Sequence, residues 1–317
     1  MLSQKASIVI PTWNGRQYLA DCLESLRRQN HPPDEIIVID NGSTDGTCEF
    51  LAENYPEVFA IPLSVNLGFS FAVNIGIGAA SGDIIVFLNN DTVCAPSWLE
   101  EIMKAAAARP EYDSFASKVV LYDKPNIIDS TGDEYTPWGS AFNRGHGEID
   151  KGQYDEEVEI FGPCAAAATY RASLFSETGI FDESFFAYYE DIDMSFRARL
   201  KARRCLYVPG AVVQHRYSAS SGKTSKLGRE EVYLHLTALL IKNMPFPLIV
   251  KNLLPILFYH SLILVFFLIA RLRKGNKLPR VPFFRLMKEA LRQRKGIQRN
   301  AAVHWRELEK TFTRKIK

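Results

Sequence analysis

The stretch IIVIDNGSTDG, residues 36–46, decides the fold. Its first four residues are apolar and β-branched, a pattern typical of a short strand that is buried on both faces. Asp40 follows directly, and the Asn, Gly and Ser residues behind it are turn formers. The stretch therefore predicts a parallel strand that carries a carboxylate at its carboxyl end.

Three further runs of this kind lie in the first 125 residues, and helical patterns separate them. The runs are residues 7–10, 58–63 and 84–88. Between the first two strands the apolar spacing of one helix face is set by Leu19, Cys22, Leu23 and Leu26. Similar patterns cover residues 44–54, 68–80 and 96–108. This alternation predicts an α/β fold with a doubly wound sheet and with sites at the carboxyl ends of its strands.

The rest of the chain divides into two parts. Residues 123–160 are typical of loops with short strands, and a second structured block follows. In that block we expect an ordered run at 164–171, helices near 172–178 and 190–203, strands at 205–208 and 211–215, and a loop at 217–226. We therefore assign residues 1–226 to one domain, with halves at 1–125 and 126–226, and residues 227–317 to a helical C-terminal region.

Charge is distributed unevenly along the 317 residues. The tail 271–317 holds 16 of the 38 basic residues and three of the 36 acidic ones, so the body is acidic. Such asymmetry indicates a charged partner for the tail. The five cysteines are scattered without a CxxC pair, which argues against a disulfide framework and a zinc site. We expect no signal peptide before Ile8.

The segment before the basic tail is unusually apolar. Residues 252–270 contain no Asp, Glu, Lys or Arg, and a membrane span needs about 20 apolar residues. A buried core helix is the alternative, but the adjoining basic residues and the amphipathic stretch 283–295 favour membrane contact. Export of the tail would oppose the positive-inside rule. We therefore expect the membrane-associating segment 245–270 to be peripheral, monotopic or re-entrant, with body and tail at the cytoplasmic face.

Two predicted strands end in candidate site residues. Asp40 could contact a base or a ribose, or could simply belong to a turn. Asn90 and Asp91 end the strand 84–88, and oxygen ligands of this kind suit a hard cation such as Mg²⁺. The alternative for this pair is a turn that caps the following helix.

A third candidate is the run Tyr188-Tyr189-Glu190-Asp191-Ile192-Asp193, at the first turn of an expected helix. Acids complement a helix N-terminus, and Asp193 can pair with Arg197 four residues on. Those roles leave the crowding of three carboxylates and two aromatic rings unexplained. A carboxylate that loses its water there would gain a raised pKa and could serve as a general base.

His215 and Lys223 complete the candidates. His215 follows the strand 211–215, where a single histidine is either structural or a ligand. Lys223 lies in the Ser/Gly/Lys loop behind it and could clamp a diphosphate or merely be solvated.

Taken in order, these motifs resemble the family 2 glycosyltransferases of the GT-A fold. The resembling segments are IVIPTWNG (8–15), VIDNGSTDGT (38–47), NLG (66–68), LNND (88–91), GIFDE (179–183), YEDID (189–193) and VP (208–209) followed by His215. The similarity covers roughly residues 6–216. Within the family the chain is most similar to the rhamnosyltransferase-like branch, which builds bacterial surface polysaccharides.

The resemblance implies an inverting transferase that uses a nucleoside-diphosphate sugar, with dTDP-rhamnose and UDP-sugars as first candidates. Its donor pocket would include Pro11, Thr12, Asn14, Asp40, Asn66, Gly68, Asn90 and Lys223. Asp91 would bind Mg²⁺ or Mn²⁺, with His215 as a further ligand, because Asn89 and Asn90 stand where a first Asp is common. Asp191 would be the catalytic base, with Glu190 and Asp193 orienting the acceptor or the helix.

The acceptor implied is a glycan or a polyprenyl-diphosphate-linked glycan at an anionic membrane surface, and we expect Asp40, Asp91 and Asp191 to converge. Three alternatives are weaker. A nucleotidyltransferase would usually carry a basic glycine-rich loop near its N-terminus, which this chain lacks. An inactive membrane scaffold would not need Asp91 and Asp191. A nucleic-acid arm would interleave more aromatic residues with the basic tail, so we expect no nucleic acid.

Overall fold

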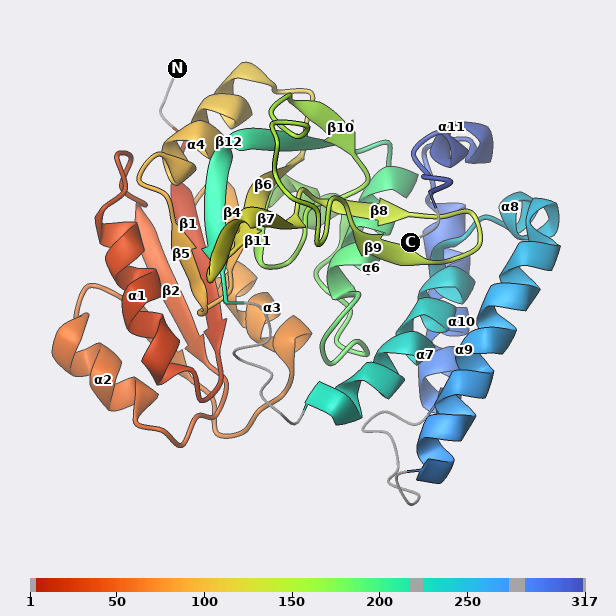
Figure 1. The fold of residues 1–317 in the computed structure, drawn as a ribbon, viewed down its shortest axis with the longest axis horizontal. Coiled ribbons are helices and arrows are strands. Elements are labelled where there is room, and N and C mark those ends of the chain that lie inside the picture. Colours follow the sequence, from red (N-terminus) through yellow and green to blue (C-terminus); the bar gives the residue numbers. More distant parts are fainter. Residues whose placement is uncertain (1–3, 217–224, 274–282, 316–317) are drawn as a thin grey trace.

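The computed structural model describes residues 4–216, 225–273 and 283–315. Its centre is a mixed, mostly parallel sheet in the order β10-β12-β6-β11-β4-β1-β2-β3, with β5 beside β12 and β7 beside β6 (Figure 1). The strands are β1 (Ala6–Thr12), β2 (Glu35–Asp40), β3 (Phe59–Pro62), β4 (Ile84–Leu88), β5 (Thr92–Cys94), β6 (Ser114–Leu121), β7 (Lys124–Ser130), β10 (Val158–Ile160), β11 (Ala167–Arg171) and β12 (Cys205–His215). A separate hairpin pairs β8 (Asp133–Tyr135) with β9 (Ala141–Asn143).

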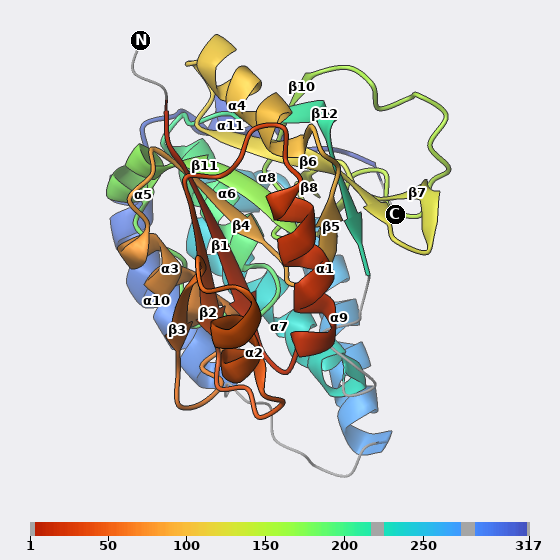
Figure 2. The same ribbon diagram turned by 90° about the vertical axis from the view of Figure 1, so that its left-hand side faces the viewer.

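Helices cover both faces of this sheet, as the sequence predicts. The helices are α1 (Arg16–Arg27), α2 (Thr47–Asn54), α3 (Phe69–Ala79), α4 (Trp98–Ala108), α5 (Ala172–Thr178), α6 (Glu190–Leu200), α7 (Ser225–Asn243), α8 (Phe246–Lys251), α9 (Leu253–Arg273), α10 (Phe283–Arg299) and α11 (Trp305–Glu309). Figure 2 shows α1 and α3 on opposite sides of β1 and β2. The predicted doubly wound sheet is confirmed, and its β3-β2-β1-β4 part is parallel.

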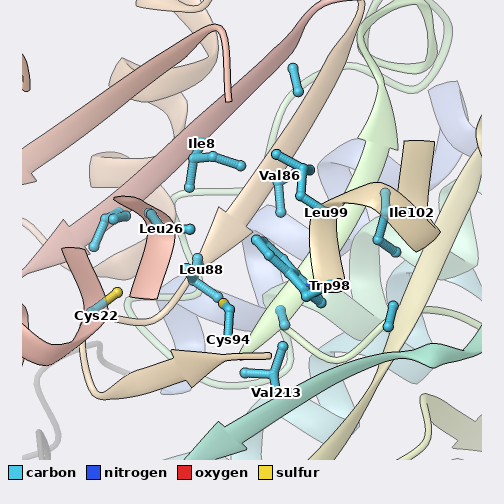
Figure 3. Packing of buried hydrophobic residues seen from close by; sticks show 14 of the residues in the cluster. Ile8, Cys22, Leu26, Val86, Leu88, Cys94, Trp98, Leu99, Ile102 and Val213 are labelled. Carbon is cyan, nitrogen blue, oxygen red and sulfur yellow. The ribbon is translucent and has the colours of Figure 1, made fainter. Parts of the chain in front are cut away.

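Strand β4 illustrates why the runs are apolar without alternation. Val86 and Leu88 point toward α1 and α4, where they pack with the fully buried Trp98 (Figure 3). Phe87 points to the other face and packs with residues of α3 and α5. Both faces of the strand are therefore buried, and each apolar side chain removed from water stabilises the fold by about 1.5–3 kcal/mol.

Two elements differ from the expected pattern. β6 lies in the middle of the sheet but was not predicted, because Ser114, Ser117 and Lys118 interrupt its apolar run. The two strands expected at 205–208 and 211–215 form one strand, β12, with a register shift between Val208 and Val212. Together β6 and β12 extend the sheet beyond its β3-β2-β1-β4 part and bring His215 beside β5.

The C-terminal helices share a core with α6. Residues of α6 such as Ile192 and Phe196 cluster with Leu236 and Leu240 of α7, with Leu248 of α8 and with buried residues of α9 and α11. Figure 1 shows α7, α9 and α10 grouped on the side of the molecule away from β1 and β2. The helix that carries the candidate base is therefore packed directly against the C-terminal region.

The apolar segment 245–270 forms two helices with a break at Asn252. Pro245 and Pro247 lie at the start of α8, and Pro255 lies in the first turn of α9, where a missing N–H costs no helical hydrogen bond. α8 and α9 are therefore separated at Asn252, and Pro255 does not interrupt α9. Among the described residues, no helix is both long and apolar enough to cross a membrane.

Candidate active site

The carboxyl ends of β1, β2 and β4 are joined by hydrogen bonds. Thr12 and Asp40 are register partners in neighbouring strands. The side chain of Asn90 reaches back from the end of β4, and its Nδ2 donates to Oγ1 of Thr12 at 2.7 Å. A Cβ on Gly15 would lie 1.8 Å from that amide nitrogen, so the close approach requires glycine there. Thr12, Asp40 and Asn90 therefore lie together at one edge of the sheet.

Asp40 is buried and already has two partners, one in its own turn and one in the first turn of α2. The N–H of Ser43 donates to Oδ1 at 3.0 Å, and the thiol of Cys48 donates to Oδ2 at 2.8 Å. Burial and the neighbouring carboxylate raise the pKa of Cys48 to about 12, so this thiol stays protonated. The turn role considered for Asp40 is thus present, and any contact with a base or ribose would use its remaining lone pairs.

The loop after β1 presents Asn14 in a left-handed conformation with φ 51°. Its N–H donates to Oγ of Ser43, and its Oδ1 accepts from the N–H of Thr44, both at 2.8 Å. Pro11 precedes this loop and pairs with Ile39 in the register of β1 and β2. The candidate donor residues of β1 and β2 are therefore held together by a defined polar network.

Asn66 and Gly68 connect this edge to the segment before α6. Oδ1 of Asn66 accepts from the N–H of Gly68 at 2.9 Å and from Nδ2 of Asn41 at 3.2 Å. Gly68 has φ +95°, and a Cβ there would lie 2.5 Å from the carbonyl oxygen of Phe186. The loop that carries Asn66 and Gly68 therefore packs against backbone that leads to Glu190.

Asp91 and His215 form the candidate metal pair. Nε2 of His215 lies 3.3 Å from Oδ1 of Asp91, and Nδ1 donates to Oδ2 of the buried Asp129 at 2.7 Å. Burial opposes a charge on this ring, but the bonds to Asp129 and Asp91 outweigh burial and raise the pKa of His215 to about 9. The carboxylate oxygen suits either Mg²⁺ or Mn²⁺, and the imidazole nitrogen, a usual ligand of transition metals, suits Mn²⁺ better than Mg²⁺. The donor set therefore fits the predicted cation.

Asp191 is tied to the same edge through Ala165 and Ala166. The N–H of Ala165 donates to Oδ2 of Asp191 at 3.0 Å. The carbonyl oxygen of Ala166 accepts from the N–H of Asn89 at 3.0 Å. These two bonds place Asp191 close in space to the segment that carries Asp91, although 100 residues separate them in sequence.

Exposure distinguishes the three acids at the start of α6. Asp191 is partly exposed, whereas Glu190 and Asp193 are buried. Burial raises the pKa of Asp191, and hydrogen bonds from the N–H groups of Ala165 and Ile192 only partly offset that effect. Of the three, Asp191 is thus the carboxylate with access to a substrate and with the raised pKa that a general base needs.

Two further groups that the sequence did not suggest lie near the acids of α6: the buried Asp133 and the partly buried Cys164. Burial raises the pKa of Glu190 and Asp133 well above the ordinary values, and the charge of Asp191 raises both further. Three side-chain atoms lie within 4.8 Å of one another: a carboxylate oxygen of Asp133, the sulfur of Cys164 and a carboxylate oxygen of Asp191. Among the described residues, Oδ2 of Asp133 and Oε2 of Glu190 have no hydrogen-bond partner. Burial therefore favours the protonated forms of Glu190 and Asp133, which lie near Asp191.

Asp193 belongs to a structural network. Its carboxylate accepts from Nε of Arg197 at 2.9 Å, which is the expected pair at i, i+4. It also accepts from Lys242 and Asn243 of α7, at 2.9 and 2.8 Å. The family resemblance gives Asp193 two possible roles, orienting the acceptor or orienting the helix, and these contacts fit the second.

The backbone before α6 is strained. Tyr188 and Tyr189 have φ values of 71° and 68°, a region that aromatic residues rarely occupy. The carbonyl oxygen of Tyr188 accepts a hydrogen bond from His235 of α7 at 3.1 Å. Strain of this kind, held by surrounding packing, is concentrated at functional sites.

Sequence reasoning missed Asp129, Asp133 and His146, and it named one residue that cannot be placed. Asp129 and Asp133 flank a Ser-Thr-Gly turn that follows the apolar pair Ile127-Ile128. A strand-end carboxylate was the signal used for Asp40 and Asp91, and the same signal could have found these two. Lys223 lies outside the described residues.

The chain matches one family model and several curated proteins. The family described as Glycosyl transferase family 2 matches residues 7–179. The chain is 26% identical over 251 residues to N-acetylglucosaminyl-diphospho-decaprenol L-rhamnosyltransferase of Mycobacterium tuberculosis, covering 68% of this chain and 77% of that protein. It is 31% identical over 229 residues to the uncharacterized glycosyltransferase YwdF of Bacillus subtilis, covering 71% and 79%.

Two solved structures share the fold at low sequence identity. The mannosyltransferase PcManGT from Pyrobaculum calidifontis, in complex with GDP-Man and Mn²⁺, has a TM-score of 0.55 and 17% identity, covering 94% of this chain and 88% of that one. GalNAc-T7 with UDP, GalNAc and Mn²⁺ has a TM-score of 0.64 and 14% identity, covering 91% and 56%. At these identities the likeness establishes the GT-A fold alone.

Proposed function

The chain belongs to glycosyl transferase family 2, and from this premise we propose that it is a metal-dependent, inverting glycosyltransferase. The donor is a dTDP- or UDP-sugar, with rhamnose as the best candidate for the sugar. The acceptor is a glycan or a polyprenyl-diphosphate-linked glycan, and the product enters bacterial surface polysaccharide. The proposal is carried by two observations: Asp91 and His215 face each other, and the partly exposed Asp191 is tied through Ala165 and Ala166 to the end of β4 that leads to Asp91. The match to a rhamnosyltransferase supports the choice of sugar and acceptor.

Asp191 is the general base in this proposal. It accepts the proton of the acceptor hydroxyl while that oxygen attacks the anomeric carbon from the face opposite the leaving diphosphate. One displacement inverts the anomeric centre, so no protein nucleophile is needed. The N–H of Ala165 orients the carboxylate, and the buried Glu190 and Asp133 keep its surroundings poorly solvated.

Asp91 and His215 hold the cation. Mg²⁺ or Mn²⁺, when bound, supplies positive charge that stabilises the departing nucleoside diphosphate. Asp91 provides a carboxylate oxygen and His215 provides Nε2, while Asp129 fixes the imidazole from its other side. The Asn90 side chain, held by Thr12, stands beside them.

The first half of residues 1–226 binds the donor in this account, and residues 126–226 bind the acceptor. Pro11, Thr12 and Asn14 line the nucleotide, and Asp40 contacts its base or ribose. Asn66, Gly68 and Asn90 complete the donor side, together with Lys223. The tight packing of Gly68 on Phe186 supports this division, because it joins the donor loop to the acceptor segment.

The membrane-associating segment 245–270 presents the enzyme to a lipid-linked acceptor. Of the α9 side chains that the structure describes, Ile256 and Ile263 are buried against the protein, and they lie two turns apart. Large apolar side chains on the other sides of the helix are exposed, including Leu254, Leu257, Phe258, Leu262 and Phe266. We call these five residues the apolar face of α9. Exposed patches of this kind mark interaction surfaces.

An anionic lipid surface is the proposed partner of that face. Exposed basic residues of α10, among them Lys288 and Lys295, accompany the exposed Phe284 and Leu291. A helix that combines exposed apolar and basic residues is suited to the interface of an anionic leaflet. We therefore place the enzyme at the cytoplasmic face of the membrane as a peripheral or monotopic protein.

The proposal is tested by transfer in vitro. The full chain is incubated with vesicles that contain GlcNAc-diphosphate-polyprenol, with dTDP-rhamnose or UDP-sugars, and with Mg²⁺, Mn²⁺ or EDTA. We expect metal-dependent transfer from one donor and an inverted anomeric configuration by NMR. Absence of both transfer and donor hydrolysis with every donor would overturn the proposal.

A further inference from the structure

Asp129 of β7 contacts two histidines with its two carboxylate oxygens. Oδ2 accepts from Nδ1 of His215 at 2.7 Å, and Oδ1 lies 3.1 Å from Nδ1 of His146. The Asp129 side chain is only 2% exposed, whereas that of His146 is 43% exposed. Burying a carboxylate costs free energy unless its charge is paired and hydrogen-bonded, and here the two imidazoles are its partners.

The backbone around His215 is fixed independently of Asp129. His215 pairs with Thr92 of β5 on one side and with Leu121 of β6 on the other. β7 is the antiparallel neighbour of β6, which brings Asp129 to the same end of the sheet. The strands therefore determine where the imidazole is attached, but not how the ring is rotated or which nitrogen carries its proton.

The bond to Asp129 determines both of these properties. An ionised carboxylate only accepts hydrogen bonds, so Nδ1 of His215 must be the donor. Binding a cation requires the neutral ring, and with the Nδ1 proton held by Asp129 the lone pair of that ring is on Nε2, the atom that faces Asp91 at 3.3 Å. An imidazole that donates one N–H to a carboxylate is the arrangement that favours a metal at the other nitrogen.

We propose that Asp129 is a positioning residue for the divalent cation: it fixes the rotation and tautomer of His215, while His146 anchors Asp129 through the opposite oxygen. This inference rests on the proposed function only in requiring that Asp91 and His215 bind a cation. It adds two residues, Asp129 and His146, that do not touch the cation themselves.

The test is direct Mn²⁺ binding to the full chain, measured by electron paramagnetic resonance and calorimetry with UDP present. Asp129→Asn keeps the shape of the side chain, but its amide can donate to Nδ1 and so move the ring proton to Nε2. We expect Mn²⁺ affinity to fall by roughly 10–100-fold. Asp113→Asn is the matched control, because Asp113 bonds the N–H of Arg204 at the far end of β6; its Mn²⁺ affinity should equal that of the wild type.

A double-mutant cycle separates positioning from general damage. If Asp129 acts through His215, then Asp129→Asn causes no further loss of Mn²⁺ affinity in a His215→Ala background. Additive losses would contradict the inference, because they would mean that Asp129 affects binding by another route. His146→Ala, at a half-exposed position, should also lower the Mn²⁺ affinity, but by a smaller factor. It replaces Asp129→Asn as the test variant if that protein does not fold.

The two possible failures can be told apart. Equal Mn²⁺ affinity of wild type, Asp129→Asn and His146→Ala would overturn the role of Asp129 and leave the proposed transferase intact. No Mn²⁺ or Mg²⁺ binding by the wild type itself would overturn the metal site, and the inference with it.

Discussion

The ammonium group of Lys242 lies 2.9 Å from the carboxylate of Asp193, and both side chains are fully buried. Lys242 also bonds Asp182 at 2.5 Å, so one cation from α7 pairs with two carboxylates of the segment 126–226. Because Asp193 lies two residues after Asp191, this pair fixes the helix that carries the candidate base. The C-terminal helices therefore support the site as well as carrying the exposed apolar face of α9.

Lys242→Met should destabilise the fold strongly. The substitution keeps an unbranched chain of similar length but leaves Asp193 with Arg197 as its cation and removes the cation that pairs with Asp182. Removing one partner of a buried ion pair typically costs about 3–5 kcal/mol. Urea unfolding of the full chain measures the change. Lys251→Met is the control, because Lys251 pairs with Glu309 at an exposed position and should cost at most about 1 kcal/mol. Equal losses in the two variants would contradict the structural role of Lys242.

Asp133→Asn should be more stable than the wild type at neutral pH, and this difference should grow as the pH rises from acidic values. In the folded state the pKa of Asp133 is raised, so the folded chain keeps a proton that the unfolded chain releases near the ordinary value of 3.8. The unfolded state then binds fewer protons, and the free energy of unfolding falls as pH rises toward the raised pKa. Asparagine removes this effect, so the variant should gain stability over the wild type at neutral pH but not at acidic pH.

Asp150→Asn is the control with the opposite sign. The bond to Lys118 lowers the pKa of Asp150, so its ionised form contributes stability that is present at neutral pH and lost as pH falls through the lowered pKa. This variant should therefore be less stable than the wild type at neutral pH. Urea unfolding at acidic and neutral pH checks both variants, and parallel pH profiles for Asp133→Asn and wild type would refute the assignment.

The pH dependence of transfer should show an acid limb from Asp191. The base must be ionised, and burial raises its pKa above the ordinary value of 3.8. Protonation as the pH falls through that raised pKa removes the acceptor for the hydroxyl proton, so kcat/KM should decline there. The profile of kcat/KM for the wild type is the measurement. A decline that begins only below pH 3.8 would exclude a buried base.

Leu254→Asp together with Phe258→Asp should weaken binding to vesicles that contain anionic lipid. Both side chains are strongly exposed, at 79% and 69%, and they lie one turn apart on the apolar face of α9. Charged groups there resist insertion into the leaflet. Vesicle co-sedimentation measures the effect, and Phe59→Asp on β3 is the control, because Phe59 is equally apolar and 57% exposed but lies far from α9.

The electrostatic part of membrane binding has its own test. Deleting 271–317 would remove Leu286, Ala290 and Leu308, which are buried against the protein, so point changes are preferable. Lys288→Glu and Lys295→Glu should each weaken binding to anionic vesicles by at least about 1 kcal/mol. Binding to neutral vesicles should change little. Unaltered binding of these variants to anionic vesicles would contradict the proposal that an anionic lipid surface is the partner of the apolar face of α9.

The sheet and the strand-end acids could be predicted because their signals are local. The run Ile36–Ile39 followed by Asp40 contains both the strand and its carboxylate within five residues. β6 could not be found in the same way, because a central strand can contain polar residues when their polar atoms are hydrogen-bonded. Ser117 accepts a hydrogen bond from Trp98, and Lys118 forms ion pairs with Asp150 and Asp155. Those partners are distant in sequence.

The site was predictable only in part for the same reason. Asp91, His215 and Asp191 stand beside elements whose periodicity is visible, whereas Asp129 gains its role from two histidines at sequence separations of 17 and 86 residues. Asp193 shows the converse. Its neighbours in sequence suggested catalysis, but Lys242 and Asn243, 49 and 50 residues away, give it a structural role.

The central claim, that Asp191 is the base of a glycosyl transfer site, is tested most directly by Asp191→Asn. Transfer is measured with saturating donor and acceptor, and donor affinity is measured separately by calorimetry with Mn²⁺ present. We predict that turnover falls by at least about 10²-fold while donor affinity stays within a factor of about two. Asp113→Asn should leave both quantities unchanged. Turnover near the wild-type rate in Asp191→Asn would contradict the account.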